Sequence, residues 1–220
     1  MDKGAFSFLT SESHNAIETM KDYYKPRRKG FTLIELLVVI VIIVTLMSIL
    51  VPVVGAARKR ATKVEAKNTL TTLVSSVDAY YNDYNRLPAN SASPPSQDQE
   101  VETTEPIMSL LAGINIDQLN IKQNVYFNGS AAKGASKGSA YKGLWEDSNS
   151  AVLYDNWRKK ANRGYIMLLD YGYDEKLDDP FRPGRRIGGR VVAWTSGKDG
   201  QWNGSNPNKG ANKDNVYSWF

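Results

Sequence analysis

The residue whose chemistry most needs an explanation is Glu35, a carboxylate at the edge of a long apolar run. None of residues 36–57 can carry a charge. An ionisable group in a membrane segment is costly and usually has a partner or a function. In surroundings of low dielectric constant a carboxylate pairs strongly with a cation, and an unpaired carboxylate is penalised. The position indicates a partner or a function for Glu35; the simpler alternative is that Glu35 only lies among lipid headgroups.

A second group of carboxylates lies in the stretch Asp170–Asp179, DYGYDEKLDD. Clustered carboxylates can perform acid–base catalysis, but turns at strand ends are also commonly acidic. The chain has no cysteine, and its single histidine, His14, falls in a polar segment without periodicity. A thiol nucleophile and a thiolate metal site are therefore excluded, and a Ser/His/Asp triad is not supported. A membrane-anchored enzyme would need a pocket around Asp170, Asp174 and Asp178; we expect no catalytic residues and no enzyme.

The excess positive charge of the chain lies on both sides of the apolar run and does not form a nucleic-acid binding face. In 220 residues the net charge is +5, yet basic residues cluster just before Phe31 and at residues 58–60. Beyond Arg60 the chain is nearly balanced, with 19 Lys and Arg against 18 Asp and Glu. A nucleic-acid partner is therefore not expected. The length suits one ordinary domain with an appendage.

Residues 36–57 are long enough to cross a membrane as a helix, since about 20 apolar residues at ~1.5 Å each span a bilayer core. A plain anchor is one interpretation. A cleaved secretory signal is another, although its apolar region is shorter, at roughly 7 to 15 residues. Basic residues at both ends leave the orientation open. Pro52 has no amide hydrogen for the carbonyl of Ser48, and Gly55 follows; we expect the helix to be weakest there.

The heptapeptide KGFTLIE, residues 29–35, followed by this apolar run resembles the N-terminal signature of type IV pilins and of the pseudopilins of type II secretion systems. The resemblance covers roughly residues 25–87. It implies that prepilin peptidase cuts between Gly30 and Phe31, and that the new amine of Phe31 is methylated. It also implies a single span in the bacterial inner membrane, with the leader in the cytoplasm and the head in the periplasm.

The same resemblance gives Glu35 a partner, because cleavage leaves a cationic amine on Phe31 of a neighbouring subunit. We expect Glu35 to be unsatisfied in a lone subunit and paired in a stack. The helix around Pro52 would stretch or melt as subunits leave the membrane and pack into a filament. The expected partners are further copies of the chain, other pseudopilins, the prepilin peptidase and an inner-membrane assembly platform.

The leader, residues 1–30, is longer than most leaders of this family. A start at Met20 would give MKDYYKPRRKG, a short basic leader of the usual size. We expect residues 1–19 to be a start-site artefact or an extension without a packing pattern.

Beyond the hydrophobic polymerisation helix, residues 31–57, we expect an amphipathic continuation over residues 58–87 that ends before Pro88. Its apolar face is predicted at Ala61, Val64, Leu70, Leu73, Val74, Val77, Tyr81 and Tyr84. Its polar face is predicted at Lys63, Glu65, Lys67, Asn68, Thr71 and Ser75. One long helix should therefore lead from the membrane into a soluble head.

The head, residues 88–220, is predicted to complete an α+β fold, in which a small antiparallel β-sheet packs on the exposed part of the long helix. Strands are expected within residues 165–171 (YIMLLDY) and 190–195 (RVVAWT). The remaining expectations are a short helix over residues 105–119 and exposed loops at residues 89–104 and 128–143.

The tail, residues 197–220, combines glycine turns, oxygen-bearing side chains and terminal aromatic residues. It resembles the calcium-binding loop of major pseudopilins, which implies a calcium ion held by Asp199, Asp214, Asn215 and Ser196. Asn215 stands where a second aspartate is common, which would weaken binding. Calcium takes about 6 to 8 oxygen ligands, some of them backbone carbonyls. The alternative is an ordinary polar loop pinned by Trp202, Tyr217 and Trp219.

Together these patterns predict a structural subunit of a type II secretion pseudopilus, which polymerises through its N-terminal helix and helps move folded proteins across the outer membrane. The alternative is a type IV pilin or minor pilin in adhesion, motility or DNA uptake. Exposed aromatic or basic patches on the head would favour that alternative.

Overall fold

The computed structural model describes residues 30–103, 106–134, 136–157, 164–204, 206–207 and 209–220. Of the expected leader it describes only Gly30, so the expectations for residues 1–29 lie outside the described part. The chain divides into two units, Met1–Val54 and Gly55–Phe220. The boundary falls close to Pro52.

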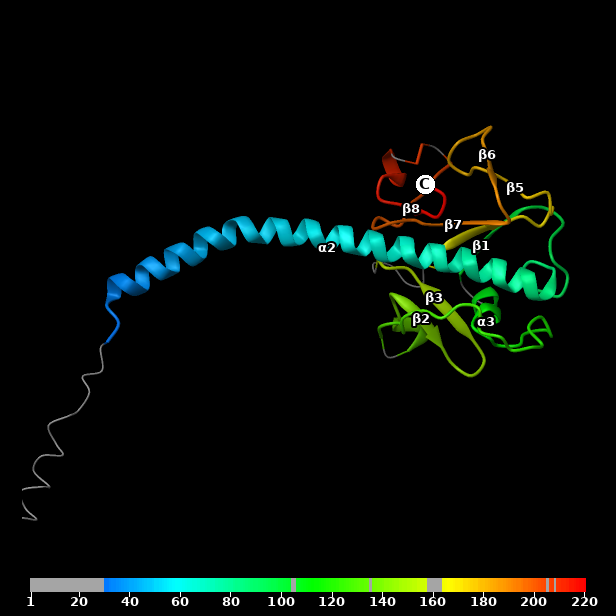
Figure 1. The fold of residues 1–220 in the computed structure, drawn as a ribbon, viewed down its shortest axis with the longest axis horizontal. Coiled ribbons are helices and arrows are strands. Elements are labelled where there is room, and N and C mark those ends of the chain that lie inside the picture. The colour runs from blue at the N-terminus through cyan, green and yellow to red at the C-terminus, as the bar shows by residue number, and fades with distance from the viewer. Residues whose placement is uncertain (1–29, 104–105, 135, 158–163, 205, 208) are drawn as a thin grey trace, which may run out of the picture. The chain divides into compact units, whose positions relative to one another are not determined.

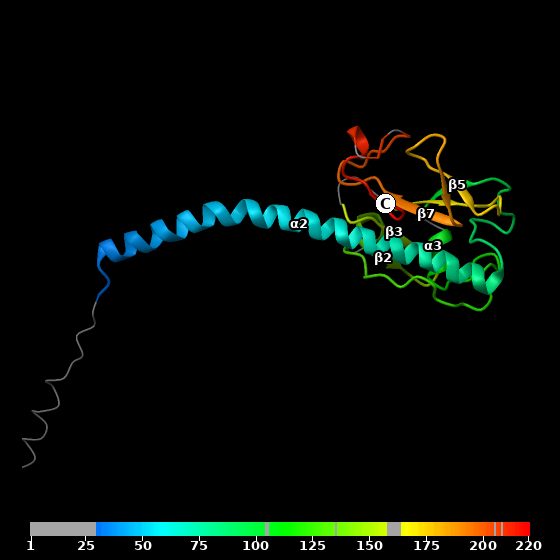
Figure 2. The same ribbon diagram turned by 45° about the horizontal axis from the view of Figure 1, so that its top comes forward.

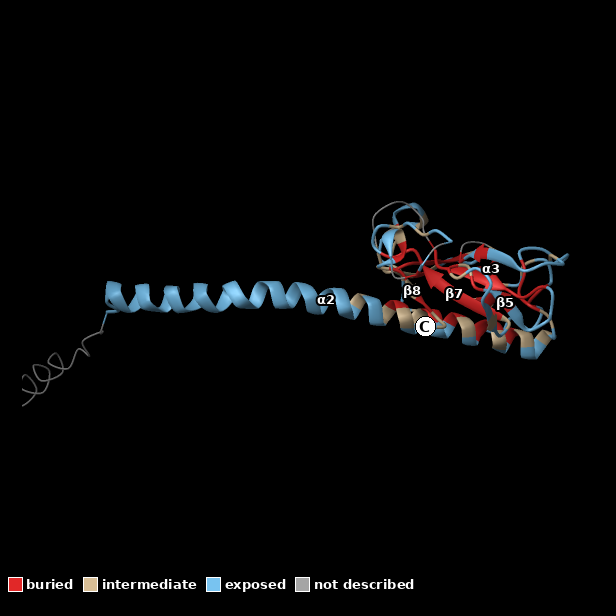
Figure 3. Cartoon of the chain, turned by 90° about the horizontal axis from the view of Figure 1, so that it is seen from above, coloured by how far each residue is buried: buried red, intermediate tan, exposed pale blue. Residues whose placement is uncertain are grey.

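Helix α2 (Leu33–Tyr84) is 52 residues long and continues through Pro52. Every residue from Gly30 to Val54 is exposed, as the pale blue part of Figure 3 shows. Within the described chain, α2 is the one helix that is long and apolar enough to cross a membrane. The prediction of one long helix is confirmed, whereas weakness at Pro52 stays a prediction.

α2 ends just before Pro88, as the sequence predicted. Asn85 adopts a left-handed backbone conformation with φ of 51°, and its N–H donates to the Tyr81 carbonyl at 2.7 Å. Asparagine tolerates this conformation better than most residues with a side chain. The Tyr171 hydroxyl then donates to the carbonyl of the buried Pro88 at 2.8 Å. These contacts turn the chain out of the helix and into the head.

The head is built on a four-stranded antiparallel sheet in the order β1-β4-β7-β8. Its strands are β1 (Gln99–Glu102), β4 (Ile166–Leu169), β7 (Val191–Thr195) and β8 (Val216–Tyr217). Met167 of β4 lies opposite both Val101 of β1 and Ala193 of β7. Figures 1 and 2 show this sheet along the second half of α2. The predicted α+β fold with an antiparallel sheet is confirmed.

The two central strands are buried on both faces, because successive side chains of a strand point to opposite sides of a sheet. Met167 joins the main core with Leu70 of α2. Its neighbour Leu168 points the other way, into a second cluster with Phe181 and Trp194. We call this second cluster the aromatic core; its buried members are Ile166, Leu168, Leu177, Phe181, Val192, Trp194 and Tyr217. The sheet thus separates a helix-facing core from an aromatic core that includes part of the tail.

Short elements complete the described head. They are α3 (Ile107–Leu111), the 3-10 turns η1 (Lys137–Ser139) and η2 (Gly210–Asn212), and the strands β2 (Gly143–Glu146), β3 (Ala151–Tyr154), β5 (Lys176–Asp178) and β6 (Arg186–Gly188). The pairs β2–β3 and β5–β6 are antiparallel. In Figure 1 the β2–β3 hairpin and α3 lie on one side of α2, and the four-stranded sheet lies on the other. The expected short helix is therefore present as α3.

Both predicted exposed loops carry more structure than their composition suggested. The stretch 89–104 contains β1, and Val101 of this strand is buried. In the stretch 128–143, the backbones of Lys133 and Tyr141 exchange two hydrogen bonds of 2.8 Å. Both predictions hold for exposure, since most described residues of the two stretches are exposed, but they miss the backbone pairing. A polar segment still offers a backbone donor and acceptor at nearly every residue, and these can pair with a neighbouring strand.

The predicted faces of the second half of α2 are also partly wrong. Ala61 and Val64 are exposed. The buried residues of α2 are Ala66, Leu70, Leu73, Ser76, Val77 and Tyr80. Ser76 and Tyr80 are tolerated there because their hydroxyls donate to the carbonyls of Tyr126 at 2.9 Å and Leu119 at 2.8 Å.

Two residues of the predicted polar face contact the head. Glu65 pairs with Lys142 at 2.7 Å, and Lys67 binds backbone oxygens of the tail. The helix has neighbours on two sides, so the arc that meets the head is wider than a single apolar stripe.

Candidate functional site

The proposed cleavage position lies in a short non-helical segment before α2. Gly30, Phe31 and Thr32 have no regular secondary structure, and Phe31 is 83% exposed. No described atom lies within 4 Å of the position that a Cβ on Gly30 would occupy. A peptidase needs its substrate backbone in an extended conformation. A glycine lets that backbone approach the enzyme closely, because it has no side chain. The bond between Gly30 and Phe31 is accessible in this way.

Glu35 closes the first turn of α2 together with Thr32. Its Oε2 accepts hydrogen bonds from both the backbone N–H and the hydroxyl of Thr32, each at 2.8 Å, while the Glu35 N–H donates to the Thr32 hydroxyl at 3.3 Å. This reciprocal pattern is a capping box, which satisfies amides that the helix start leaves open. The expectation that Glu35 is unsatisfied in a lone subunit is therefore wrong for one of its oxygens.

The other oxygen, Oε1, receives no hydrogen bond from the residues that the structure describes. Thr32 was missed as a functional residue by the sequence reasoning, although the pattern Thr-x-x-Glu before an apolar run is the known signal of a capping box.

Pro52 follows two hydroxyl-bearing residues of α2, Thr45 and Ser48, and lies just before Val54, where the first unit ends. It leaves the carbonyl of Ser48 without its helical donor. The hydroxyls of Thr45 and Ser48 donate back to the carbonyls of Ile42 at 2.8 Å and Thr45 at 2.7 Å. Such bonds compete with the helix ladder and favour bending. This stretch thus carries three local weaknesses while remaining helical.

In the tail, a tight turn brings two of the predicted calcium ligands together. Asp214 Oδ2 accepts the N–H groups of Lys198 at 2.7 Å and Asp199 at 3.2 Å. Gly197 has φ of 64°, and a Cβ there would lie 2.8 Å from Asp214. Only a residue without a side chain fits this approach. Asp199 uses its own Oδ1 to accept the Gln201 N–H at 2.9 Å.

Two buried oxygens in this turn are left without a donor. Asp214 Oδ1 and Asn215 Oδ1 are both buried and unpaired among the described atoms. Leaving a buried acceptor unsatisfied costs about 1–3 kcal/mol, more for a charged group. Both are oxygen donors of the type that calcium prefers. Among the described residues, no group of three or more His, Cys, Asp or Glu side chains is placed to hold a metal ion. A calcium ion here would therefore need backbone, amide and hydroxyl oxygens as well, with buried Ser196 close by in sequence.

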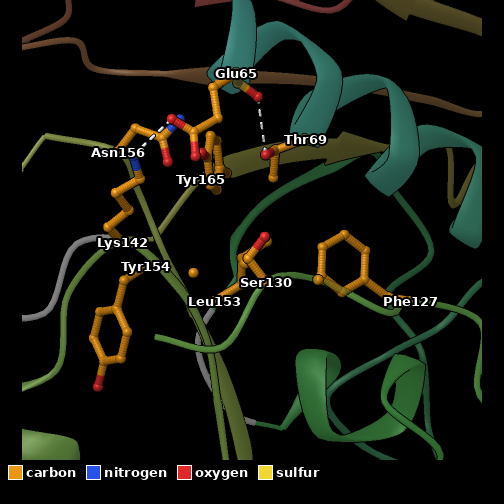
Figure 4. Close-up of a pocket in the computed structure, with 11 residues that line it drawn as sticks. Glu65, Thr69, Phe127, Ser130, Lys142, Leu153, Tyr154, Asn156 and Tyr165 are labelled. Carbon is orange, nitrogen blue, oxygen red and sulfur yellow. Dashed lines mark hydrogen bonds and ion pairs between the residues drawn. The ribbon is translucent and has the colours of Figure 1, made fainter. Parts of the chain in front are cut away.

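The head also contains a small cavity of about 60 Å³ between α2 and the β2–β3 hairpin. Figure 4 shows Glu65 and Thr69 of α2 beside Tyr165, with Lys142 paired to Glu65. Tyr165 is fully buried, and burial raises the pKa of its hydroxyl. A cavity of this size holds a few water molecules. Its lining supplies hydroxyls and one ion pair, and the Thr69 hydroxyl donates to the backbone carbonyl of Glu65 at 3.1 Å.

The carboxylates of the acidic stretch, residues 170–179, stabilise turns and pair with arginine. The carboxylate of buried Asp170 accepts the N–H groups of Asp174 at 3.2 Å and Glu175 at 2.7 Å. Arg186 pairs with Asp174 at 3.0 Å and with Asp178 at 3.3 Å. The described hollow nearest to them is lined by Asp174 but by neither Asp170 nor Asp178. Asp174 and Asp178 thus share Arg186, whereas the Asp170 carboxylate accepts backbone N–H groups of the turn.

Comparison with known proteins supports the interpretation of the N-terminal segment. Residues 25–51 match the family model described as the prokaryotic N-terminal methylation motif. The N-terminal segment therefore resembles the methylated N-terminal segment that this model describes. The chain is also 40% identical over 63 residues to the type II secretion system core protein G of Pectobacterium carotovorum subsp. carotovorum. Both findings support the type IV pilin-like and pseudopilin family, as residues 29–35 predicted.

The match to this relative covers 29% of the chain and 40% of the relative, so the chain spans less than half of the relative's length. No solved structure matches the chain. Pilin-like and pseudopilin families are structural, and the long apolar helix fits a membrane-anchored member.

Proposed function

We propose that this chain is a structural subunit of a type II secretion pseudopilus. In this proposal it is cut between Gly30 and Phe31 by prepilin peptidase, methylated on Phe31, and polymerised through α2 with further copies and other pseudopilins on an inner-membrane assembly platform. The observation that carries the proposal is the methylation motif at residues 25–51 on a helix whose apolar half is fully exposed. The relative that is a secretion-system protein favours secretion.

In this proposal Glu35 has two tasks. The capping box with Thr32 fixes the start of α2 in each subunit and occupies Oε2. Oε1 remains for the cationic amine that cleavage creates on Phe31 of a neighbouring subunit. An ion pair in the apolar surroundings of packed helices would be strong, while a neighbour out of register would leave a buried charge unpaired. Glu35 would thereby set the register of the stack.

The proposed location is the bacterial inner membrane, crossed once by the first half of α2, with the head in the periplasm and the filament in the periplasm or at the cell surface. The second candidate is a type IV pilin or minor pilin. It is favoured by one surface feature: the exposed ring of Phe220 stacks with the guanidinium of Arg182 at 4.3 Å, next to Arg185. Mature protein in sheared surface fibres would favour the pilin, and retention in the periplasm would favour the pseudopilin.

The test is mass spectrometry of the mature N-terminus from cells with active prepilin peptidase. We expect a chain that begins with N-methylated Phe31. The same cells without the peptidase are the control and should retain the uncut chain. A chain that stays intact across Gly30 and Phe31 while the peptidase is active would overturn the proposal.

We also propose that the tail holds a calcium ion. Asp214 and Asn215 would supply their unpaired oxygens, with Asp199, Ser196 and backbone carbonyls completing the set. The ion would neutralise Asp214 and cross-link the start of the tail turn to its end. Its role would be structural, because it would satisfy two oxygens that have no donor among the described atoms.

A further inference from the structure

Lys67 connects α2 to the tail by hydrogen bonds. Its ammonium donates to the main-chain oxygens of Tyr217 at 2.6 Å, Phe220 at 2.7 Å and Ser218 at 3.1 Å. A lysine ammonium has three N–H donors and no acceptor. Three oxygens from one short segment therefore match its full donor capacity. Neither composition nor helical periodicity predicted this contact, because Lys67 is separated from the tail by about 150 positions.

The sheet alone holds the backbone of this segment by few bonds. β8 has only two residues and pairs with β7 at an edge of the sheet. Beyond β8, the Ser218 N–H donates to the Ala193 carbonyl at 2.8 Å, and the Ser218 hydroxyl accepts the Ala193 N–H at 2.9 Å. An edge strand of this length is weak by itself. The rings of Tyr217 and Trp219 pack on Phe181, and the Tyr217 hydroxyl donates to the carbonyls of Pro207 at 3.1 Å and Asn212 at 3.3 Å, so side chains hold this segment more than β8 backbone pairing does.

The oxygen-rich turn joins this segment directly. Asp214 and Asn215 are followed at once by Val216, the first residue of β8. Asp214 also receives the N–H groups of Lys198 and Asp199 from the chain that leaves β7. A shift of β8 along β7 would therefore move Asp214 relative to the turn that it closes. The position of β8, which Lys67 helps to fix, determines where the two unpaired oxygens lie.

Placing the Lys67 ammonium here costs desolvation free energy, which indicates that the contact has a specific role. Burial lowers the pKa of Lys67, since desolvation disfavours its charged form. Carbonyl oxygens replace part of the lost water. Lys63, one turn earlier on α2, is exposed. It provides a matched lysine on the same helix.

We propose that Lys67 is a positioning residue that latches the tail, residues 214–220, onto α2, and that it thereby sets the affinity of the tail turn for its cation. The second half of this proposal rests on the proposed calcium site. By thermodynamic reciprocity, a cation in the turn should in return strengthen the grip of α2 on the tail. The device would link occupancy of the turn to the helix that carries the head.

The experiment compares four full-length variants in detergent micelles: Lys67→Met, Lys67→Arg, Lys63→Met and Tyr126→Phe. Lys67→Met keeps the aliphatic stem and removes the ammonium. Lys67→Arg keeps a charge and donors. Lys63→Met is the control for loss of a lysine. Tyr126→Phe is the control for lost head stability away from the tail, because it removes the hydrogen bonds of the Tyr126 hydroxyl with Asp83 and Asn124.

Two quantities are measured on each variant: hydrogen exchange of peptides covering residues 212–220 in calcium-free buffer, and calcium affinity by titration calorimetry. We expect Lys67→Met to speed tail exchange about tenfold and to weaken calcium binding about tenfold. Lys67→Arg should restore part of both. Lys63→Met should match the wild type, and Tyr126→Phe should leave calcium affinity unchanged.

The outcomes separate the latch from the calcium site. Tail exchange in Lys67→Met equal to that in Lys63→Met would overturn the latch. Faster exchange with wild-type calcium affinity would overturn the coupling. If the wild type binds no calcium, the calcium proposal fails, and the exchange result alone decides whether Lys67 holds the tail.

Discussion

The two halves of α2 belong to one helix and have opposite relations to the rest of the chain. From Phe31 to Val54 every side chain is exposed, whereas from Ala66 onward a face of the helix is buried against the head. The first half has the more apolar sequence, yet none of the described residues covers it. A surface this apolar is not stable in water and must be covered by lipid or by other molecules. The second half is stabilised within one chain, and the first half depends on its surroundings.

The largest effect should follow from removing the one carboxylate of the first half. Glu35→Leu should leave membrane insertion intact or improved, because an apolar side chain costs less in lipid. Filament assembly should be abolished, as judged by electron microscopy of sheared or periplasmic fibres. Normal fibres from Glu35→Leu would refute the ion pair between subunits.

Two further variants separate the charge of Glu35 from its role in the capping box. Glu35→Gln retains an oxygen that can accept from Thr32 but has no charge, and it should also fail to assemble. Thr32→Ala removes the hydroxyl and keeps the charge, so it should assemble with reduced efficiency. If Glu35→Gln assembled and Thr32→Ala did not, the cap rather than the charge would be the decisive feature.

The second half of α2 should respond to loss of apolar side chains even in a single subunit. Leu70 is fully buried, so Leu70→Ala should lower the free energy of unfolding of the head by about 2–5 kcal/mol. Leu46, which is 63% exposed, is the matched control in the first half. Leu46→Ala should leave thermal unfolding of the head in detergent unchanged, as followed by circular dichroism. Equal destabilisation by both variants would mean that the two halves do not differ as described.

Loss of calcium from the tail turn should have a smaller effect on the stability of the head, and the two aspartates of the turn should contribute unequally to it. Removal of calcium by EDTA should lower the melting temperature of the wild-type head, because an ion that binds only the folded state stabilises it. Asp214→Ala should remove this sensitivity, since it eliminates an unpaired buried oxygen. Asp199→Ala should reduce it less, because the Asp199 carboxylate already accepts the Gln201 N–H. A wild-type melting temperature that does not change with EDTA would remove calcium from the tail.

The sequence predicted the parts of the molecule that local patterns determine. The apolar run, the stop before Pro88 and the central strands β4 and β7 follow from composition and spacing over a few residues. The strands β1 and β8 were missed because their pairing depends on distant neighbours: Val101 finds Met167, and β8 closes on β7. The contacts of Glu65 and Lys67 were misjudged for the same reason. Charged residues are usually solvated, and only the fold shows which of them meet a partner.

The turns were predictable where a local rule exists. The left-handed Asn85 and the tight approach at Gly197 both follow known preferences of these residue types. The capping box of Thr32 and Glu35 also follows a local rule, since Thr-x-x-Glu before an apolar run is its sequence signal. The unpaired oxygens of Asp214 and Asn215 could not be foreseen, since they depend on which donors the fold brings near.

The smallest effect should come from a charge in the second half of α2 that is satisfied within the chain, in contrast to Glu35. Asp83 Oδ2 accepts the Tyr126 hydroxyl at 2.6 Å and the Asn124 amide at 2.9 Å, and the Lys122 ammonium lies 3.9 Å from Oδ1. The hydrogen bond from Tyr126, and then the one from Asn124, holds the pKa of Asp83 below its usual value. In the unfolded chain an aspartate titrates near about 3.9.

The sign of the pH dependence follows from this lowered pKa. The contribution of Asp83 to stability is fully present above the unfolded value and is lost as the pH falls through the lower folded value. Asp83→Asn should therefore lower the melting temperature of the head slightly at pH 7, and the difference from wild type should vanish near pH 2. Glu146→Gln, at an exposed carboxylate on β2, is the control. It should change the melting temperature of the head neither at pH 7 nor in acid. A difference for Asp83→Asn that persists undiminished in acid would show that the lost hydrogen-bond geometry, and not the charge, sets the effect, and the contrast with Glu35 would then rest on assembly alone.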